Sequence, residues 1–318
     1  MILQILILIA GLVLILFGAN YLVDGSSSIA KKFGLSEFVI GLTIVGIGTS
    51  TPEMVVSFLS AIQGKADMAI GNIVGSNIFN TLMILGVTAL IAPLTITKTN
   101  HRKDIPLNIL VTGLLIILGL NFTIFRFGQD GLGRIDGIIL LGIFAWYLWS
   151  SFKSDSSDSD GESQIKEYSS LVSILFIIGG LVGLIVGGKL FVNGATELAK
   201  ALGVSDKFIA ITIMAAGTSM PELATCVIAA LKGRGQLALG NVLGSNISNI
   251  LLILGGAAVI KPLSFSGMTP VDLGIVMLSA IMLFFTSYTF KKKELDRVEG
   301  AIFILLEVGY MWYLIAHL

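Results

Sequence analysis

The chain has 318 residues, of which 55% are apolar and only 13% charged, and its formal net charge is zero. This balance excludes a nucleic-acid binder, which needs a basic surface, and a disulfide scaffold, since Cys226 is the single cysteine. Ten apolar segments are long enough to cross a bilayer as helices, so the sequence predicts an all-α polytopic membrane protein. They lie near 4–23, 37–62, 67–92, 105–121, 133–152, 169–191, 206–231, 237–260, 271–290 and 299–316.

The first segment resembles a secretory leader only in its hydrophobicity, because it lacks a basic start. Its continuation, residues 23–36, matches residues 192–205 at an offset of 169. A cleaved leader would not be rebuilt in the middle of a protein. We therefore expect the first segment to belong to the fold.

The second segment carries a proline next to a carboxylate, Pro52 and Glu53, at the end of a Gly-Thr-Ser-Thr-Pro-Glu motif. Proline has no N–H and crowds the carbonyl four residues back, so the helix should bend and free a carbonyl near Gly48. A carboxylate in lipid is costly unless it faces a cavity, a partner or an ion. The hydroxyl groups within one turn of it belong to Thr49 and Ser50.

The third segment places one polar stripe on a helix, because Asn72, Ser76 and Asn80 recur at a spacing of four. Gly71 and Gly75 have the same spacing, which lets a neighbouring helix approach closely. Segments four and five complete a first half, residues 1–152. The sequence thus predicts a polar face opposite the Glu53 carboxylate.

Residues 153–168 interrupt the apolar pattern with Ser, Asp and Gly. Four of these residues fall at positions three, five, six and twelve of a calcium-binding EF-hand loop: Asp158, Asp160, Gly161 and Glu167. Position one, however, is Ser156, and no flanking helices are evident. A flexible acidic linker is therefore the favoured interpretation.

The second half, residues 169–318, repeats the first. Residues 23–94 and 192–263 agree at 32 of 72 positions without a gap, and residues 132–137 resemble residues 295–300 at an offset of 163. Each half therefore holds five helices. The second copy of the polar residues consists of Thr218, Ser219, Glu222, Asn241, Ser245 and Asn249.

An odd number of spans in each half forces the halves to enter the membrane from opposite sides, as in many secondary transporters. The positive charges agree with a topology in which both termini are outside and the linker is cytoplasmic. The basic residues that then fall inside are Lys31, Lys32, Lys98, Arg102, Lys103, Lys153, Lys166, Lys232, Arg234, Lys291, Lys292, Lys293 and Arg297. Those outside are only Lys65, Arg126, Arg134, Lys200, Lys207 and Lys261.

The candidate ligands of the two copies are two carboxylates together with amide, hydroxyl and carbonyl oxygens, with no imidazole or thiol. Calcium takes about six to eight oxygen ligands, whereas zinc or copper usually recruits His or Cys. Two carboxylates also balance one divalent ion. The joint occurrence of kink, hydroxyl groups and Glu, twice at one offset, favours an ion site over a simple helix kink.

The two Gly-Thr-Ser-x-Pro-Glu motifs, each followed by Gly-Asn-x-x-Gly-Ser-Asn, resemble the alpha repeats of the sodium/calcium exchanger family, in its prokaryotic form without a large regulatory loop. The resemblance covers essentially all ten helices. It implies exchange of Ca²⁺ for Na⁺ by alternating access in the cell (inner) membrane, with no prosthetic group. Helices one and six, rich in Gly, would be the moving pair.

The resemblance also implies a role for each polar residue. Glu53 and Glu222 would ligate Ca²⁺ at the membrane midplane with the carbonyls of Thr49 and Thr218, and Asn80 and Asn249 would line the middle. One flanking sodium site would use Gly46, Thr49, Ser50, Glu53 and Ser76. The other would use Ala215, Thr218, Ser219, Glu222 and Ser245.

Asn249 departs from the relatives that carry Asp at this position, including the potassium-dependent branch. A neutral amide removes one charge from the centre and argues against potassium co-transport. Stoichiometry, direction of flux and oligomeric state stay open.

Two rival functions remain. A Ca²⁺/H⁺ antiporter of the same fold would use a buried Glu to carry protons, and a passive cation channel would use the same ligands without a counter-gradient. An intramembrane hydrolase is excluded because the helices offer no nucleophile with a His or Asp base. Cys226 is expected to be a small packing residue, and Lys189 to reach the membrane interface. Glu307, midway along the last helix, has no assigned role.

Overall fold

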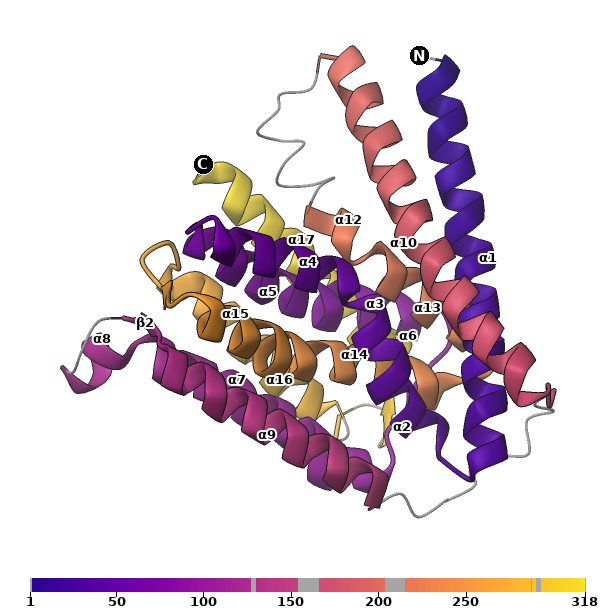
Figure 1. Ribbon diagram of the computed structural model, residues 1–318, viewed down its shortest axis with the longest axis horizontal. Coiled ribbons are helices and arrows are strands. Elements are labelled where there is room, and N and C mark those ends of the chain that lie inside the picture. The colour runs from indigo at the N-terminus through magenta and orange to yellow at the C-terminus, as the bar shows by residue number, and fades with distance from the viewer. Residues whose placement is uncertain are drawn as a thin grey trace.

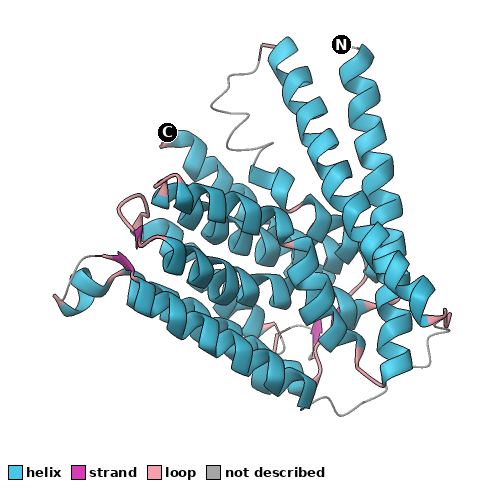
Figure 2. Cartoon of the chain, in the orientation of Figure 1, coloured by secondary structure: helices cyan, strands magenta, loops and turns pink. Residues whose placement is uncertain are grey.

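The computed structural model describes residues 2–126, 130–153, 166–203, 215–286, 288–289 and 293–317. The described chain is almost entirely helical (Figures 1 and 2), because lipid offers no partner to an open backbone group. Among the described residues, six helical runs are long and apolar enough to cross a membrane, and a seventh is the bent pair Glu37–Thr49 and Thr51–Ile62. The predicted all-α membrane architecture is confirmed at this level, while the count of ten spans stays a prediction.

In the first half, α1 is followed by a bent run, by a second run with a π-helical turn in its middle, and by two outer helices. Their bounds are α1 Ile2–Phe33; α2 Glu37–Ile40, η1 Gly41–Val45, α3 Gly46–Thr49 and α4 Thr51–Ile62; α5 Ala66–Phe79, η2 Asn80–Ile84 and α6 Leu85–Ile91; η3 Asn100–Asp104, α7 Ile105–Gly119 and α8 Asn121–Phe125; α9 Arg134–Lys153.

The second half follows the same order. Its helices are α10 Ser170–Ala201; α12 Ala215–Thr218 and α13 Met220–Leu231; α14 Gly235–Ser248, η5 Asn249–Leu254 and α15 Gly255–Ile260; α16 Pro270–Phe285; α17 Arg297–Ala316. Residues 206–214 of the predicted seventh segment lie outside the described residues, as do linker positions 156, 158, 160 and 161.

The first and sixth helices are longer than predicted. The predicted segments ended at residues 23 and 191, whereas α1 continues to Phe33 and α10 to Ala201. The continuation of α1 is polar but buried, and Ser173 of α10 donates to Ser28 Oγ at 2.9 Å. Apolar length alone underestimated both helices, and in α1 the neighbouring helix α10 supplies a partner for the Ser28 hydroxyl.

Helices α1 and α10 lie side by side and antiparallel, at an angle to the rest of the bundle (Figure 1). Their contact is lined by glycines spaced seven residues apart. These are Gly11, Gly18 and Gly25 on α1, and Gly180, Gly187 and Gly194 on α10. A Cβ atom on Gly18 would lie 2.8 Å from the Gly180 carbonyl oxygen, so the two backbones touch directly.

The centre of the bundle is formed by the two runs 66–91 and 235–260. In their most apolar windows 72% and 78% of the residues are buried, compared with 22% in α1. Close packing at Gly240 and Gly244 is confirmed, since a Cβ atom there would overlap the carbonyl oxygens of Phe38 and Leu42. For Gly71, the nearest described atom is Met268 Cε at 3.6 Å.

Four strands of two residues each depart from the purely helical prediction. β1 Leu94–Thr95 pairs with β4 Glu294–Leu295, and β2 Gly131–Leu132 pairs with β3 Leu263–Ser264, both antiparallel. Leu94 and Leu263 are equivalent positions of the sequence repeat, as are Leu132 and Leu295. Each ribbon therefore joins two different loops, one from each half, and the two ribbons are equivalent to each other under the repeat.

Candidate ion-binding site

The first Gly-Thr-Ser-x-Pro-Glu motif of the repeat forms a break between two helices, as its proline predicts. Helix α3 ends at Thr49, Ser50 has φ −78° and ψ 10°, and α4 begins at Thr51 with Pro52 in its first turn. The two sides of the break are bent by 48°. The carbonyl of Gly48 accepts a hydrogen bond from the Thr51 hydroxyl at 2.7 Å, so the chain itself supplies one partner.

The second copy has the same local geometry. Helix α12 ends at Thr218, Ser219 has φ −89° and ψ 6°, and α13 begins at Met220 with Pro221 in its first turn. Each motif therefore places its carboxylate, Glu53 or Glu222, in the first turn of a helix. The partial positive charge of a helix N-terminus favours an anion there.

The two carboxylates are buried, with 1% and 0% of Glu53 and Glu222 exposed, and each is held by the other half of the chain. Ser50 donates to Glu222 Oε1 at 3.1 Å, and Ser219 donates to Glu53 Oε1 at 3.3 Å. Ser76 adds a longer bond to Glu53 Oε1 at 3.5 Å. This reciprocal pair of hydroxyl bonds brings the two motifs to one place.

Within the part of the chain that the structure describes, four buried oxygens of this region lack a hydrogen-bond partner: Glu53 Oε2, Glu222 Oε2, Asn80 Oδ1 and Asn249 Oδ1. They form two repeat-related pairs, one carboxylate and one amide from each half. Buried polar atoms in proteins are normally hydrogen-bonded, so unpartnered oxygens indicate a missing positive partner. Oxygen atoms of this kind suit a hard cation such as Ca²⁺ or Na⁺.

A second layer of amides supports the carboxylate helices. Asn72 donates to the Glu53 carbonyl at 3.2 Å and to Ser57 Oγ at 3.0 Å. Its equivalent Asn241 donates to Cys226 Sγ at 3.2 Å. Cys226 is fully buried and occupies the place of Ser57, in agreement with its predicted packing role.

The remaining candidate residues lie around the same break points. Thr49 is buried and donates to Asn241 Oδ1 at 3.1 Å, and Ser245 donates to the Gly46 carbonyl at 3.1 Å. Thr218 is half-buried at the end of α12. Ala215 begins α12, and its side chain is outside the described residues.

Two asparagines that the polar stripe did not include also belong here, Asn77 and Asn246. They follow Ser76 and Ser245 directly, so a spacing of four misses them. Asn249 donates to Asn77 Oδ1 at 2.9 Å, and Asn80 donates to Asn246 Oδ1 at 3.2 Å. Their recurrence at the repeat offset was the available signal. The π-helical turns η2 and η5 begin at Asn80 and Asn249, and such turns are frequent at functional sites.

Glu307 is a further buried carboxylate, on α17. Among the described residues its Oε2 atom has no hydrogen-bond partner. Within those residues no three His, Cys, Asp or Glu side chains form a cluster that could hold a metal ion. A site here must therefore rely on carboxylates together with neutral oxygens.

The sequence model described as sodium/calcium exchanger protein matches residues 3–153 and 172–316. The chain belongs to this family. It is 36% identical to the putative antiporter CaxA of Alkalimonas amylolytica, over 96% of this chain and 97% of that protein. It is 35% identical to the sodium/calcium exchanger MaX1 of Methanosarcina acetivorans, with the same coverage of each chain.

Structural comparison agrees with the family assignment. The sodium–calcium exchanger NCX_Mj, solved without Na⁺ and Ca²⁺, superposes with a TM-score of 0.84 at 33% identity, over 98% of this chain and 99% of that one. This member of the sodium/calcium exchanger family is therefore an integral membrane cation/calcium antiporter, and its relatives are transporters rather than enzymes.

Proposed function

We propose that the chain exchanges Ca²⁺ for Na⁺ across the membrane by alternating access, with Glu53 and Glu222 as ligands shared by both ions. The names of its relatives MaX1 and NCX_Mj support these two cargo ions. The proposed arrangement is two inverted halves of five helices, residues 1–152 and 169–318. Both termini lie outside the cell membrane, and linker 153–168 is cytoplasmic.

The single observation that carries this proposal is the set of four unpartnered oxygens on Glu53, Glu222, Asn80 and Asn249. Two carboxylates balance the charge of one Ca²⁺, and neutral oxygens complete a shell of about six to eight ligands. The candidates for this shell are the carbonyls of Thr49 and Thr218 and the hydroxyl groups of Ser50, Ser76, Ser219 and Ser245.

Sharing of the carboxylates explains exchange. Na⁺ ions in the flanking positions, near Gly46 and Ala215, would engage the same Glu side chains as Ca²⁺. Occupancy by one ion therefore lowers the affinity for the other, and a gradient of Na⁺ can drive Ca²⁺ in the opposite direction.

Helices α1 and α10 are proposed as the element that moves. Their direct backbone contact makes them one body, and they lie beside the central runs rather than between them (Figure 1). Sliding of this pair over the centre would open the site to one side of the membrane and then to the other.

Reconstituted protein tests the coupling ion. In vesicles loaded with Na⁺ and diluted into Na⁺-free medium, we expect Ca²⁺ uptake that stops when K⁺ replaces internal Na⁺. Uptake that follows an imposed pH gradient and ignores Na⁺ would instead place the chain among Ca²⁺/H⁺ antiporters. Flux without any counter-gradient would indicate a channel.

A further inference from the structure

Asn80 and Asn249 each have an amide oxygen that can ligate a cation and an amide NH₂ group that would repel it. Which end faces the site depends on where the NH₂ group is bound. In the structure Asn80 donates to Asn246 Oδ1 at 3.2 Å, and Asn249 donates to Asn77 Oδ1 at 2.9 Å. Both NH₂ groups are thus held by the opposite half, and both oxygens are left without a partner.

The two supporting asparagines are themselves fixed. Asn77 donates to the Asn246 carbonyl at 3.1 Å, and Asn246 donates to Thr81 Oγ1 at 2.9 Å. Thr81 has Ile250 as its repeat equivalent, which has no hydroxyl, so Asn77 cannot make the bond that corresponds to this last one. Asn77 and Asn246 are 2% exposed each, so water does not compete for these bonds.

We infer that Asn77 and Asn246 are positioning residues that fix the amide oxygens of Asn80 and Asn249 toward the ion. This inference rests on the proposed function, since it specifies how the same site presents its neutral ligands. Each residue acts across the two halves, so the correct orientation exists only when the halves are assembled. Groups that orient metal ligands typically change metal affinity by about 10–100-fold when removed.

The test is a double-mutant cycle on Ca²⁺ binding to the purified full chain, measured by calorimetry. Asn77→Leu should weaken binding about 10–100-fold. In an Asn249→Ala background the same change should have an effect within about twofold, because its target is already absent. Thr88→Val is the matched control, since Thr88 is buried and, among the described residues, its hydroxyl bonds only to the Ile84 carbonyl.

The outcomes separate the two levels of the proposal. Wild-type protein that binds no Ca²⁺ would contradict the proposed function itself. The positioning role would be overturned if Asn77→Leu left Ca²⁺ affinity at the wild-type value. It would also be overturned if Asn77→Leu reduced Ca²⁺ affinity as much in the Asn249→Ala background as in the wild-type protein. If the leucine variant does not fold, Asn77→Ser withdraws the acceptor with a smaller change and serves in the same cycle.

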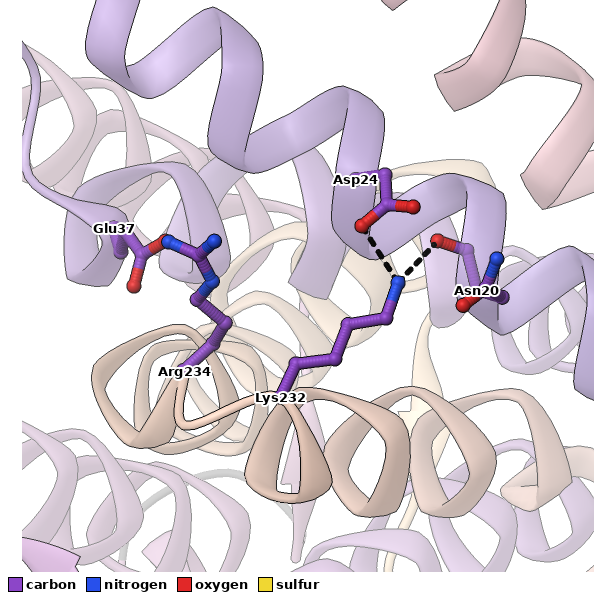
Figure 3. A network of polar contacts seen from close by, with 5 residues as sticks. All are labelled: Asn20, Asp24, Glu37, Lys232 and Arg234. Carbon is purple, nitrogen blue, oxygen red and sulfur yellow. Dashed lines mark hydrogen bonds and ion pairs between the residues drawn. The ribbon is translucent and has the colours of Figure 1, made fainter. Parts of the chain in front are cut away.

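The turn between α13 and α14 contacts α1 near the C-terminal end of that helix (Figure 3). Lys232, just after α13, donates to Asp24 Oδ1 at 2.6 Å and to the Asn20 carbonyl at 3.3 Å, both on α1. Arg234 of the same turn bonds Glu37 of α2 at 2.9 Å. The turn therefore joins α1 and α2 to the second half by two ion pairs.

The repeat-equivalent positions differ in charge. Asp24 corresponds to Asn193, and Lys232 corresponds to Gln63. The ion pair between α1 and the turn is therefore replaced by two uncharged amide side chains at the equivalent positions. Gln63 and Asn193 are both exposed. The glycine of each turn, Gly64 or Gly233, has a positive φ of 76° or 72°, so the two turns share a backbone shape and differ in chemistry.

We propose that the Lys232–Asp24 ion pair, called the latch below, stabilises the state in which the ion site is closed to the side of the membrane where Lys232 lies. The latch acts on one side only, because the other half has no equivalent ion pair. Under the proposed function, α1 must leave the core on that face for the site to open there. An ion pair present in one state only shifts the population toward that state. The proposed topology puts this face in the cytoplasm, so the resting protein would be open to the outside.

Charge reversal with hydrogen exchange tests the latch on the full chain in nanodiscs. Asp24→Lys and Lys232→Asp should each raise exchange of the amides near residues 20–33 several-fold, and the double swap should restore protection. Lys31→Gln is the control. The Lys31 side chain is 45% exposed and pairs at 2.7 Å with Glu167, and this contact lowers the pKa of the Glu167 carboxyl.

Unchanged exchange in both single variants, or a double swap that exchanges as fast as they do, would overturn the latch. A raised exchange in Lys31→Gln would show that any charge change at this end of α1 has the same effect, which would also overturn it. Ca²⁺ uptake under a Na⁺ gradient is measured in parallel. If wild-type uptake is absent, the proposed function fails independently of the exchange result.

Discussion

Glu53 and Glu222 are the side chains whose charge the proposed ion site requires. Replacement of either by Gln keeps the shape and removes the charge, so Ca²⁺ uptake driven by Na⁺ should fall about 100-fold or more. Removal of one partner from a buried charge arrangement costs about 3–5 kcal/mol, which corresponds to a loss of this size. The measurement is initial uptake into vesicles loaded with Na⁺.

Glu197→Gln is the control for this prediction, because the Glu197 side chain is 59% exposed on α10 and reaches Lys200 only at 4.0 Å. It should transport at the wild-type rate. Wild-type uptake by Glu53→Gln or Glu222→Gln would contradict the assignment of the carboxylates as ligands.

The carboxylates and the polar stripe could be predicted from the sequence as candidate site residues, since both follow from the spacing of residues along one helix. The hydrogen-bond partners of the carboxylates could not be predicted from the sequence. The bonds from Ser50 to Glu222 and from Ser219 to Glu53 join residues 172 and 166 positions apart. Asn77 and Asn246 were missed for a similar reason, because the partners of their amide groups lie in the opposite half.

At the scale of elements, the glycine contact between α1 and α10 gives a matched pair of variants. A Cβ atom on Gly180 would lie 2.7 Å from the Gly18 carbonyl oxygen and the Leu22 nitrogen, whereas at Gly179 no described atom lies within 4 Å. Gly180→Ala should therefore force the helices apart and destabilise the protein by about 1–3 kcal/mol.

Gly179→Ala should be neutral or stabilising by up to about 1 kcal/mol, because Ala has the better helix propensity. Thermal unfolding in detergent compares the two variants, and uptake shows whether the loosened pair still transports. Equal behaviour of both alanines would contradict direct backbone contact between α1 and α10.

The positions of the helices could be predicted where they follow from apolar length or from a proline break, as at Pro52 and Pro221. The ends of the helices could not be predicted in this way. The polar continuation of α1 past residue 23 reads as a loop in isolation and becomes helix because α10 covers Ser28. The paired strands of residues 94–95 and 294–295 likewise need both halves to be present.

At the scale of the whole molecule, the central claim is that two halves assemble one site in which Na⁺ and Ca²⁺ compete. The sequence repeat predicts the two halves, and the reciprocal bonds of Ser50 and Ser219 join them at the carboxylates. The inverted orientation and the count of ten spans remain predictions that rest on charge distribution and helix number.

Equilibrium binding of Ca²⁺ to the purified protein at rising Na⁺ concentration tests that claim most directly. If both ions share Glu53 and Glu222, the apparent Kd for Ca²⁺ should rise steadily with Na⁺, while K⁺ at equal ionic strength should leave it unchanged. A Kd for Ca²⁺ that is the same at every Na⁺ concentration would contradict a shared site.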